Sequence, residues 1–132
     1  MKVLFVCKGN WYRSQIAAAL YNQLTHGEEG SSAGTYVGAM DEPEGQSVST
    51  LMPADFFETA EAHGLDLRTH RTRKLTPEMM ESVDVVVSMA EEPYIPDFLR
   101  TNPKVVFWDV PDGKRAEAMY QKIASLVSGL VQ

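Results

Sequence analysis

The feature that most constrains the fold is a short apolar run at the start of the chain that leads directly into the only cysteine. The run from Val3 to Val6 is typical of a fully buried strand in a parallel sheet. Gly9 and Asn10 follow, the two residue types that most readily adopt left-handed backbone conformations. A helical pattern then begins at Arg13, so we expect a strand, a tight loop and a helix start to surround the thiol of Cys7.

This arrangement predicts a site for an oxyanion. The backbone N–H groups of such a loop and the positive end of the next helix suit a phosphate dianion or an analogue of it. The helix dipole and the guanidinium of Arg13 favour the thiolate form of Cys7. Ser14 can add a hydrogen bond to the sulfur, and Arg13 can hold two phosphoryl oxygens with its planar fork. Together these groups indicate in-line attack of sulfur on phosphorus.

Composition narrows the class of protein. A chain of 132 residues is expected to form one domain, 1–132, with a core that needs no disulfide or metal. A formal net charge of −6 argues against nucleic acid or an anionic membrane as a partner. One cysteine cannot form an internal disulfide, and three scattered histidines give no metal-ligand spacing, so no metal or cofactor is expected. The first apolar run is too short for a signal peptide or membrane span, which predicts a cytoplasmic location.

The remaining pattern predicts alternating helices and strands. Helices are expected where apolar residues recur at helical spacing or start signals occur, at 13–26, 56–62, from 77 and at 116–130, with a short helix or turn at 93–100. A strand or strand end is expected at 36–38 and further strands at 84–89 and 105–108, with 39–53 as a long surface loop. Short connections between such elements imply an α/β fold, a doubly wound parallel sheet of four strands flanked by helices.

Two aspartates are candidates for a general acid. Ligands bind beyond the carboxyl ends of the strands in such sheets, where Cys7 lies. Asp109 and Asp112 come just after the last expected strand. Either carboxyl group could protonate a leaving oxygen and later accept a proton from water.

The segment from Cys7 to Ser14, with a strand before it and Ser32-Ala33-Gly34-Thr35 after it, resembles a known family. The resemblance is to the low-molecular-weight protein tyrosine phosphatases and to the thioredoxin-coupled arsenate reductases of the same fold. The segments 63–67, 70–75, 84–89 and 110–112 follow in the family's order, so the likeness spans nearly the whole chain. The Cys-x5-Arg-Ser loop is its specific signal.

The resemblance implies a phosphomonoesterase that acts through a cysteinyl-phosphate intermediate on a phosphorylated protein or a small aryl phosphate. Cys7 matches the nucleophile, Arg13 the phosphate-binding arginine and Asp112 the general acid. Asn10 matches the residue that holds the left-handed turn, buttressed by Ser32 and His70. The loop that binds phosphate or another oxyanion comprises Lys8, Gly9, Asn10, Trp11, Tyr12 and Ser14. A monomer or weak dimer is expected.

Some residues depart from the family pattern. Tyr12 stands where many members have a second cysteine, so their protective disulfide cannot form. Gly113 replaces the usual proline after the acid, and the tyrosines that often follow are absent. Trp11 is bulkier than the usual aliphatic residue. These departures leave phosphotyrosine preference open and indicate a remodelled pocket wall.

Three other functions remain open at this point. Arsenate mimics phosphate, but a chain with one cysteine would need an external small thiol for arsenate reduction. A phosphocarrier would accept a phosphoryl group at a strand-end cysteine, but it needs neither a general acid nor an arginine fork. A non-catalytic module would bind phosphate without turnover.

Overall fold

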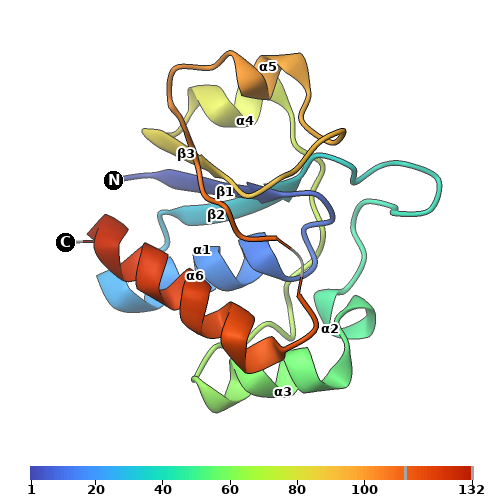
Figure 1. Ribbon diagram of the computed structural model, residues 1–132, viewed down its shortest axis with the longest axis vertical. Helices are drawn as coiled ribbons and strands as arrows, with labels where there is room; N and C mark the ends of the chain where they lie inside the picture. The colour runs from blue at the N-terminus through green and yellow to red at the C-terminus, as the bar shows by residue number, and fades with distance from the viewer. Residues whose placement is uncertain (112, 132) are drawn as a thin grey trace.

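The computed structural model describes residues 1–111 and 113–131, and its centre is a parallel sheet (Figure 1). The strands are β1 (Val3–Cys7), β2 (Gly30–Gly34), β3 (Val85–Ser88) and β4 (Val105–Phe107). They are arranged in the order β2-β1-β3-β4, and all neighbours are parallel. The prediction of a four-stranded parallel sheet is therefore confirmed.

Helices cover both faces of this sheet, as the doubly wound arrangement requires. One face carries α1 (Arg13–Thr25), α2 (Val48–Leu51), α3 (Ala54–Ala62) and α6 (Ala116–Val131). The other face carries α4 (Pro77–Glu81) and α5 (Asp97–Arg100). The two sets lie below and above the sheet in Figure 1.

Strand β1 organises both cores because it lies between β2 and β3. Its side chains alternate between the two faces. Phe5 and Cys7 join the core under α1, α3 and α6, whereas Leu4 and Val6 join the core under α4 and α5. All five strand residues are at most 2% exposed. A shift of one residue in register would exchange the two sets of side chains.

Strand β2 differs from the sequence expectation, which placed a strand at 36–38. The observed strand consists of small residues, and packing explains this better than intrinsic preference. A Cβ atom on Gly30 would lie 2.9 Å from Cδ1 of Tyr21, and one on Gly34 would lie 2.7 Å from the carbonyl oxygen of Lys8. The edge strand thus approaches α1 and the Cys7 loop too closely for larger side chains.

Two helix boundaries also differ from expectation. Helix α1 ends at Thr25, and His26, with φ of 54°, is its left-handed C-cap, although the sequence predicted a helix that continues to 26. Helix α2 interrupts the segment 39–53 that was expected to be loop throughout. Among the residues that the structure describes, no helix combines the length and apolar character needed to cross a membrane. The domain extent of 1–132 stays a prediction.

Candidate functional site

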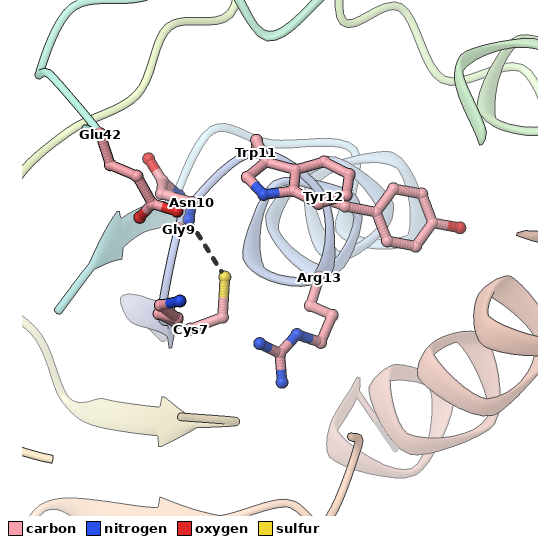
Figure 2. A pocket seen from close by; sticks show the side chains of 8 residues that line it. Cys7, Gly9, Asn10, Trp11, Tyr12, Arg13 and Glu42 are labelled. Atoms are coloured by element: carbon pink, nitrogen blue, oxygen red, sulfur yellow. Dashed lines mark hydrogen bonds between the residues drawn. The ribbon is translucent and has the colours of Figure 1, made fainter. Parts of the chain in front are cut away.

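The carboxyl end of β1, the loop after it and the start of α1 enclose a cavity of about 240 Å³ (Figure 2). Cys7 lies at its floor and is 2% exposed. The lining residues are Cys7, Lys8, Gly9, Asn10, Trp11, Tyr12, Arg13 and Glu42. The structure therefore brings the expected thiol, loop and arginine to one cavity, and it adds Glu42, which the sequence did not single out.

Two hydrogen-bonding groups point at the sulfur of Cys7. The backbone N–H of Asn10 donates to Sγ over 3.3 Å, and Oγ of Ser14 lies 3.0 Å from Sγ. The side-chain amide of Asn10 donates to the same Oγ over 2.7 Å. Because that oxygen already accepts a hydrogen bond, its own proton is available to the sulfur. Both groups can therefore stabilise a thiolate.

Helix α1 presents its N-terminus to the same cavity. Its first N–H groups have no acceptors within the helix. Tyr12 occupies the N-cap position, and its side chain makes no capping hydrogen bond in the described part of the chain. A bound oxyanion can take the place of a cap, where the helix dipole also favours negative charge.

Asn10 holds the loop in shape. It is fully buried and has φ of 54°, as the sequence predicted for this turn. Its Oδ1 accepts from the backbone N–H of Arg73 over 2.8 Å and from Nε2 of Gln15 over 3.3 Å. The same Nε2 also donates to the carbonyl oxygen of Asn10 over 3.1 Å. The side chain therefore joins the loop, α1 and the segment before α4.

Gln15 was missed by the sequence analysis, although it connects the loop to His70. Nδ1 of His70 lies 3.0 Å from Oε1 of Gln15, so His70 acts on Asn10 through Gln15. Burial lowers the pKa of His70, which favours the neutral ring. Ser32 lies on β2 opposite Phe5, and none of the hydrogen bonds described for Asn10 goes to it. A glutamine one position after Ser14, at the start of a helix, carries no sequence signal for this role.

Gly9 and Trp11 shape the rim of the cavity. The left-handed conformation expected at both Gly9 and Asn10 occurs only at Asn10. Gly9 is needed for a different reason, because a Cβ there would lie 2.7 Å from Cδ1 of Trp11. The indole in turn stacks on Phe56 of α3, with ring centroids 6.3 Å apart. The bulky residue therefore forms part of the rim rather than filling the floor.

Arg13 is 3% exposed and is held by two segments beyond the strands. Its Nη1 donates to the carbonyl oxygens of Met89 and Val110, each over 2.9 Å. Glu91 pairs with Nη1 and Nη2 over 2.9 and 3.3 Å. Glu91 follows the end of β3, so its position at the carboxyl edge of the sheet was the signal that could have identified it. These contacts set the orientation of the guanidinium beside the cavity.

Two lining residues direct their polar ends away from the sulfur. The hydroxyl of Tyr12 donates to the carbonyl oxygen of Ala116 over 3.2 Å, and Figure 2 shows it pointing away from Cys7. Burial, with nearby carboxylates, raises the pKa of Tyr12 to about 12, so it stays neutral. The ammonium of Lys8 lies over the rings of Tyr94 and Tyr36, 4.3 and 5.1 Å from their centroids. Cation–π attraction thus holds that positive charge near the rim.

The structure describes one of the two candidate general acids. Asp112 lies outside the described residues. Asp109 is exposed and does not line the cavity. Val110 between them accepts the hydrogen bond from Arg13 through its carbonyl oxygen. Within residues 1–111 and 113–131, no three His, Cys, Asp or Glu side chains gather closely enough to hold a metal ion.

Comparison with known proteins gives the family. The family profile described as low molecular weight phosphotyrosine protein phosphatase matches residues 2–105. The chain is 32% identical over 90 residues to the low molecular weight protein-tyrosine-phosphatase Etp of Escherichia coli K12, covering 68% of this chain and 55% of Etp. It is 32% identical over 92 residues to a protein-arginine-phosphatase of Bacillus subtilis, covering 70% and 57%. The chain thus spans just over half the length of these curated relatives.

A solved structure shows the same fold over a larger share. Wzb of Vibrio vulnificus, determined in complex with benzylphosphonate, superposes with a TM-score of 0.78 at 23% identity. The match covers 98% of this chain and 95% of that one. The profile match spans most of the sequence and includes the whole cavity loop. The chain therefore belongs to the low molecular weight phosphotyrosine protein phosphatase family.

Proposed function

We propose that this protein is a cysteine-dependent phosphomonoesterase that acts on phosphorylated proteins or small aryl phosphates such as phosphotyrosine. One observation carries the proposal: the sulfur of Cys7 lies at the floor of a cavity, within hydrogen-bonding reach of Asn10 and Ser14. Arg13 lines the same cavity. A thiolate, an uncapped helix start and a guanidinium in one place suit attack on a phosphoryl group.

The first half-reaction transfers the phosphoryl group to sulfur. The thiolate of Cys7 attacks phosphorus in line with the leaving oxygen, so an S–P bond forms and the P–O bond breaks. Arg13 and the loop N–H groups stabilise the three equatorial oxygens. Asp112 donates a proton to the leaving oxygen.

The second half-reaction releases phosphate. Water attacks phosphorus, the S–P bond breaks and the thiolate returns. Asp112, now ionised, accepts the proton of the attacking water. One carboxyl group therefore serves both steps, as acid and then as base.

The first test is hydrolysis of an aryl phosphate by the native protein and by Cys7→Ser in a buffer with a metal chelator. We expect turnover by the native protein and a fall of at least about 10³-fold in the variant, since the nucleophile is lost. Acid quench during turnover should trap phosphate bound to Cys7, detected by mass spectrometry. Equal turnover by both proteins would refute the proposal.

The general acid is tested by Asp112→Asn with Asp109→Asn as the matched control. Loss of an acid slows poor leaving groups more than good ones. We expect Asp112→Asn to reduce hydrolysis of phenyl phosphate far more than that of p-nitrophenyl phosphate, and Asp109→Asn to change neither. The reverse pattern would move the acid to Asp109.

The same samples test two of the three alternatives left open by the sequence, arsenate reduction and a non-catalytic phosphate-binding module. Arsenate reduction with an added small thiol, without phosphate ester hydrolysis, would assign the loop to arsenate chemistry. Binding of inorganic phosphate without any turnover would indicate a non-catalytic module. Either result would replace the phosphomonoesterase assignment.

A further inference from the structure

A second cavity, of about 250 Å³, adjoins the one above Cys7. Gly9, Trp11 and Glu42 line both cavities. In Figure 2, Glu42 and Trp11 lie above Cys7, and Arg13 lies beside it, to the right. When the phosphoryl group of a substrate lies at the sulfur, the residue next to the phosphorylated one would therefore lie beside this second cavity.

The second cavity is lined by acidic residues, whereas the first is suited to binding an anion. Asp41 and Glu42 both line it, and its described lining contains no Lys, Arg or His. Of the cations near the loop, Lys8 lies over two tyrosine rings, and Arg71 donates to the carbonyl oxygen of Gly45 over 2.9 Å. The charge of Asp41 is felt locally, because it raises the pKa of Tyr36.

The rest of the lining is apolar. Trp11 contributes an indole, the ring type that attracts cations most strongly. Pro43 and Leu51 add aliphatic surface, and Leu51 is 43% exposed. A long side chain with an apolar stem and a positive head fits this lining. Its stem would lie on the apolar surface, and its head would lie beside the carboxylates and the indole.

We propose that this cavity is a subsite for a lysine or arginine side chain of the substrate, next to the phosphorylated residue. The proposal rests on the proposed function, since it places a substrate across both cavities. Asp41 and Glu42 would attract a cationic substrate side chain and repel a carboxylate, so the subsite would select substrates by charge. Asp41 lines only the second cavity, which makes it the residue to change.

The test compares three phosphotyrosine peptides that differ only in the residue beside phosphotyrosine: Arg, Gln or Glu. For the native protein we expect kcat/KM to be roughly fivefold higher with Arg than with Gln, and lower again with Glu. Raising the ionic strength should reduce this spread because Asp41 is exposed and salt screens its charge. Asp41→Lys should reverse the order, so that the Glu peptide becomes the preferred one.

Tyr36→Phe is the matched control. It removes the phenolic hydroxyl beside Asp41 while leaving the carboxylate charge, so the preference for Arg should remain. Thermal unfolding of each variant checks that Asp41→Lys is folded. If Asp41→Lys does not fold, Asp41→Asn should still narrow the Arg-to-Glu spread. A spread unchanged by both substitutions would overturn the subsite.

Two further measurements distinguish a failure of the subsite from a failure of the proposed phosphatase function. Turnover of p-nitrophenyl phosphate, which has no neighbouring residue, reports the phosphatase activity alone. Normal turnover of that ester with no difference among the peptides would overturn the subsite and leave the proposed function standing. If no ester is hydrolysed, calorimetric binding of the same peptides with phosphonomethyl-phenylalanine decides the point. Equal affinity for the Arg and Glu peptides would then refute the subsite.

Discussion

The floor and the outer wall of the cavity are built in opposite ways. The floor, residues 7–15, has buried polar groups that bond to one another, and Asn10 alone makes contacts with Cys7, Ser14, Gln15 and Arg73. The outer wall, residues 36–47, is a polar loop whose Met40 is fully exposed. It is attached to the segment 70–74 by hydrogen bonds such as the one that the backbone N–H of Gly45 donates to the carbonyl oxygen of Thr72 over 2.9 Å.

This difference teaches how the site divides its tasks. Groups that touch reacting atoms need fixed geometry, and the floor provides it through a connected network on β1 and α1. The groups of the proposed subsite lie on an exposed loop, which tolerates change. Substitutions in the floor should therefore cost both stability and turnover, whereas those in the wall should alter selectivity or nothing.

The largest effect is expected for Asn10→Ala, which breaks the floor. Ser14, Gln15 and Arg73 would each lose a hydrogen bond to the Asn10 side chain, and alanine disfavours φ of 54°. We expect a loss of about 2–4 kcal/mol in the free energy of unfolding and about 10²-fold in kcat/KM.

Asn10→Gly separates the two causes of that loss. Glycine accepts the positive φ but lacks the amide, so it should restore part of the stability and little of the turnover. Urea unfolding and aryl phosphate hydrolysis measure both quantities. Full turnover in Asn10→Ala would show that the network is not needed for the chemistry.

The next effect concerns Glu91, which orients Arg13 from outside the floor. Glu91→Gln keeps the shape but removes the charge that pairs with the guanidinium. We expect roughly a tenfold fall in kcat/KM and weaker competitive inhibition by phosphate, with little change in unfolding because the Glu91 side chain is 44% exposed.

Glu91→Asp is the control, because it keeps the negative charge on a shorter side chain. It should recover part of the phosphate affinity if orientation of Arg13 is the cause. Inhibition constants for phosphate in the native protein and both variants give the comparison. An unchanged inhibition constant in Glu91→Gln would mean that the two backbone carbonyls alone orient Arg13.

A smaller effect is expected for His70, through the pH dependence of the free energy of unfolding. The pKa of His70 is lowered by burial, so the unfolded chain binds more protons than the folded one between the folded pKa and about 6.5. The stability contribution is complete above about pH 6.5 and is lost as the pH falls towards the folded pKa.

His70→Asn keeps a donor towards Gln15 without a titrating ring. Its unfolding free energy should therefore decline less between neutral and mildly acidic pH than that of the native protein. Denaturant unfolding across this range measures the difference. Parallel curves for the two proteins would assign the acid sensitivity to other groups.

The smallest effect is expected in the wall. Met40→Ser removes a fully exposed side chain, so the unfolding free energy should stay within about 0.5 kcal/mol and aryl phosphate turnover within about twofold. The same two assays used for Asn10 apply. A large loss would show that the wall is structurally coupled to the floor after all.

Most of the floor could be predicted from the sequence because its members are close together in the chain. A buried apolar run, a cysteine, a turn residue and a helix start within 14 residues place Cys7, Asn10, Arg13 and Ser14 together by local geometry. The strands β1 and β3 and the helices α1 and α6 followed from strong periodicity. The roles of Cys7, Arg13 and Asp112 in catalysis stay predictions.

The misses share a physical cause. Strand β2 has little strand preference, and it forms because small residues fit the close approach of β1, Tyr21 and Lys8. Gln15 contacts His70 and Glu42 reaches a cavity lined by residues 7–13, and nothing near either residue in the sequence marks its role. Glu91 could have been identified by its place after β3, at the carboxyl edge of the sheet.

The sequence by itself determined the position of the thiol, the turn beside it and the parallel sheet, because these depend on local conformation and on apolar periodicity. Only the tertiary structure decided which carboxylates approach the site. Glu91 reaches Arg13 from beyond β3, and Glu42 reaches the cavity from the loop after β2. Such contacts depend on how parallel strands lie side by side, and strand order is a property of the folded sheet rather than of any segment of the chain.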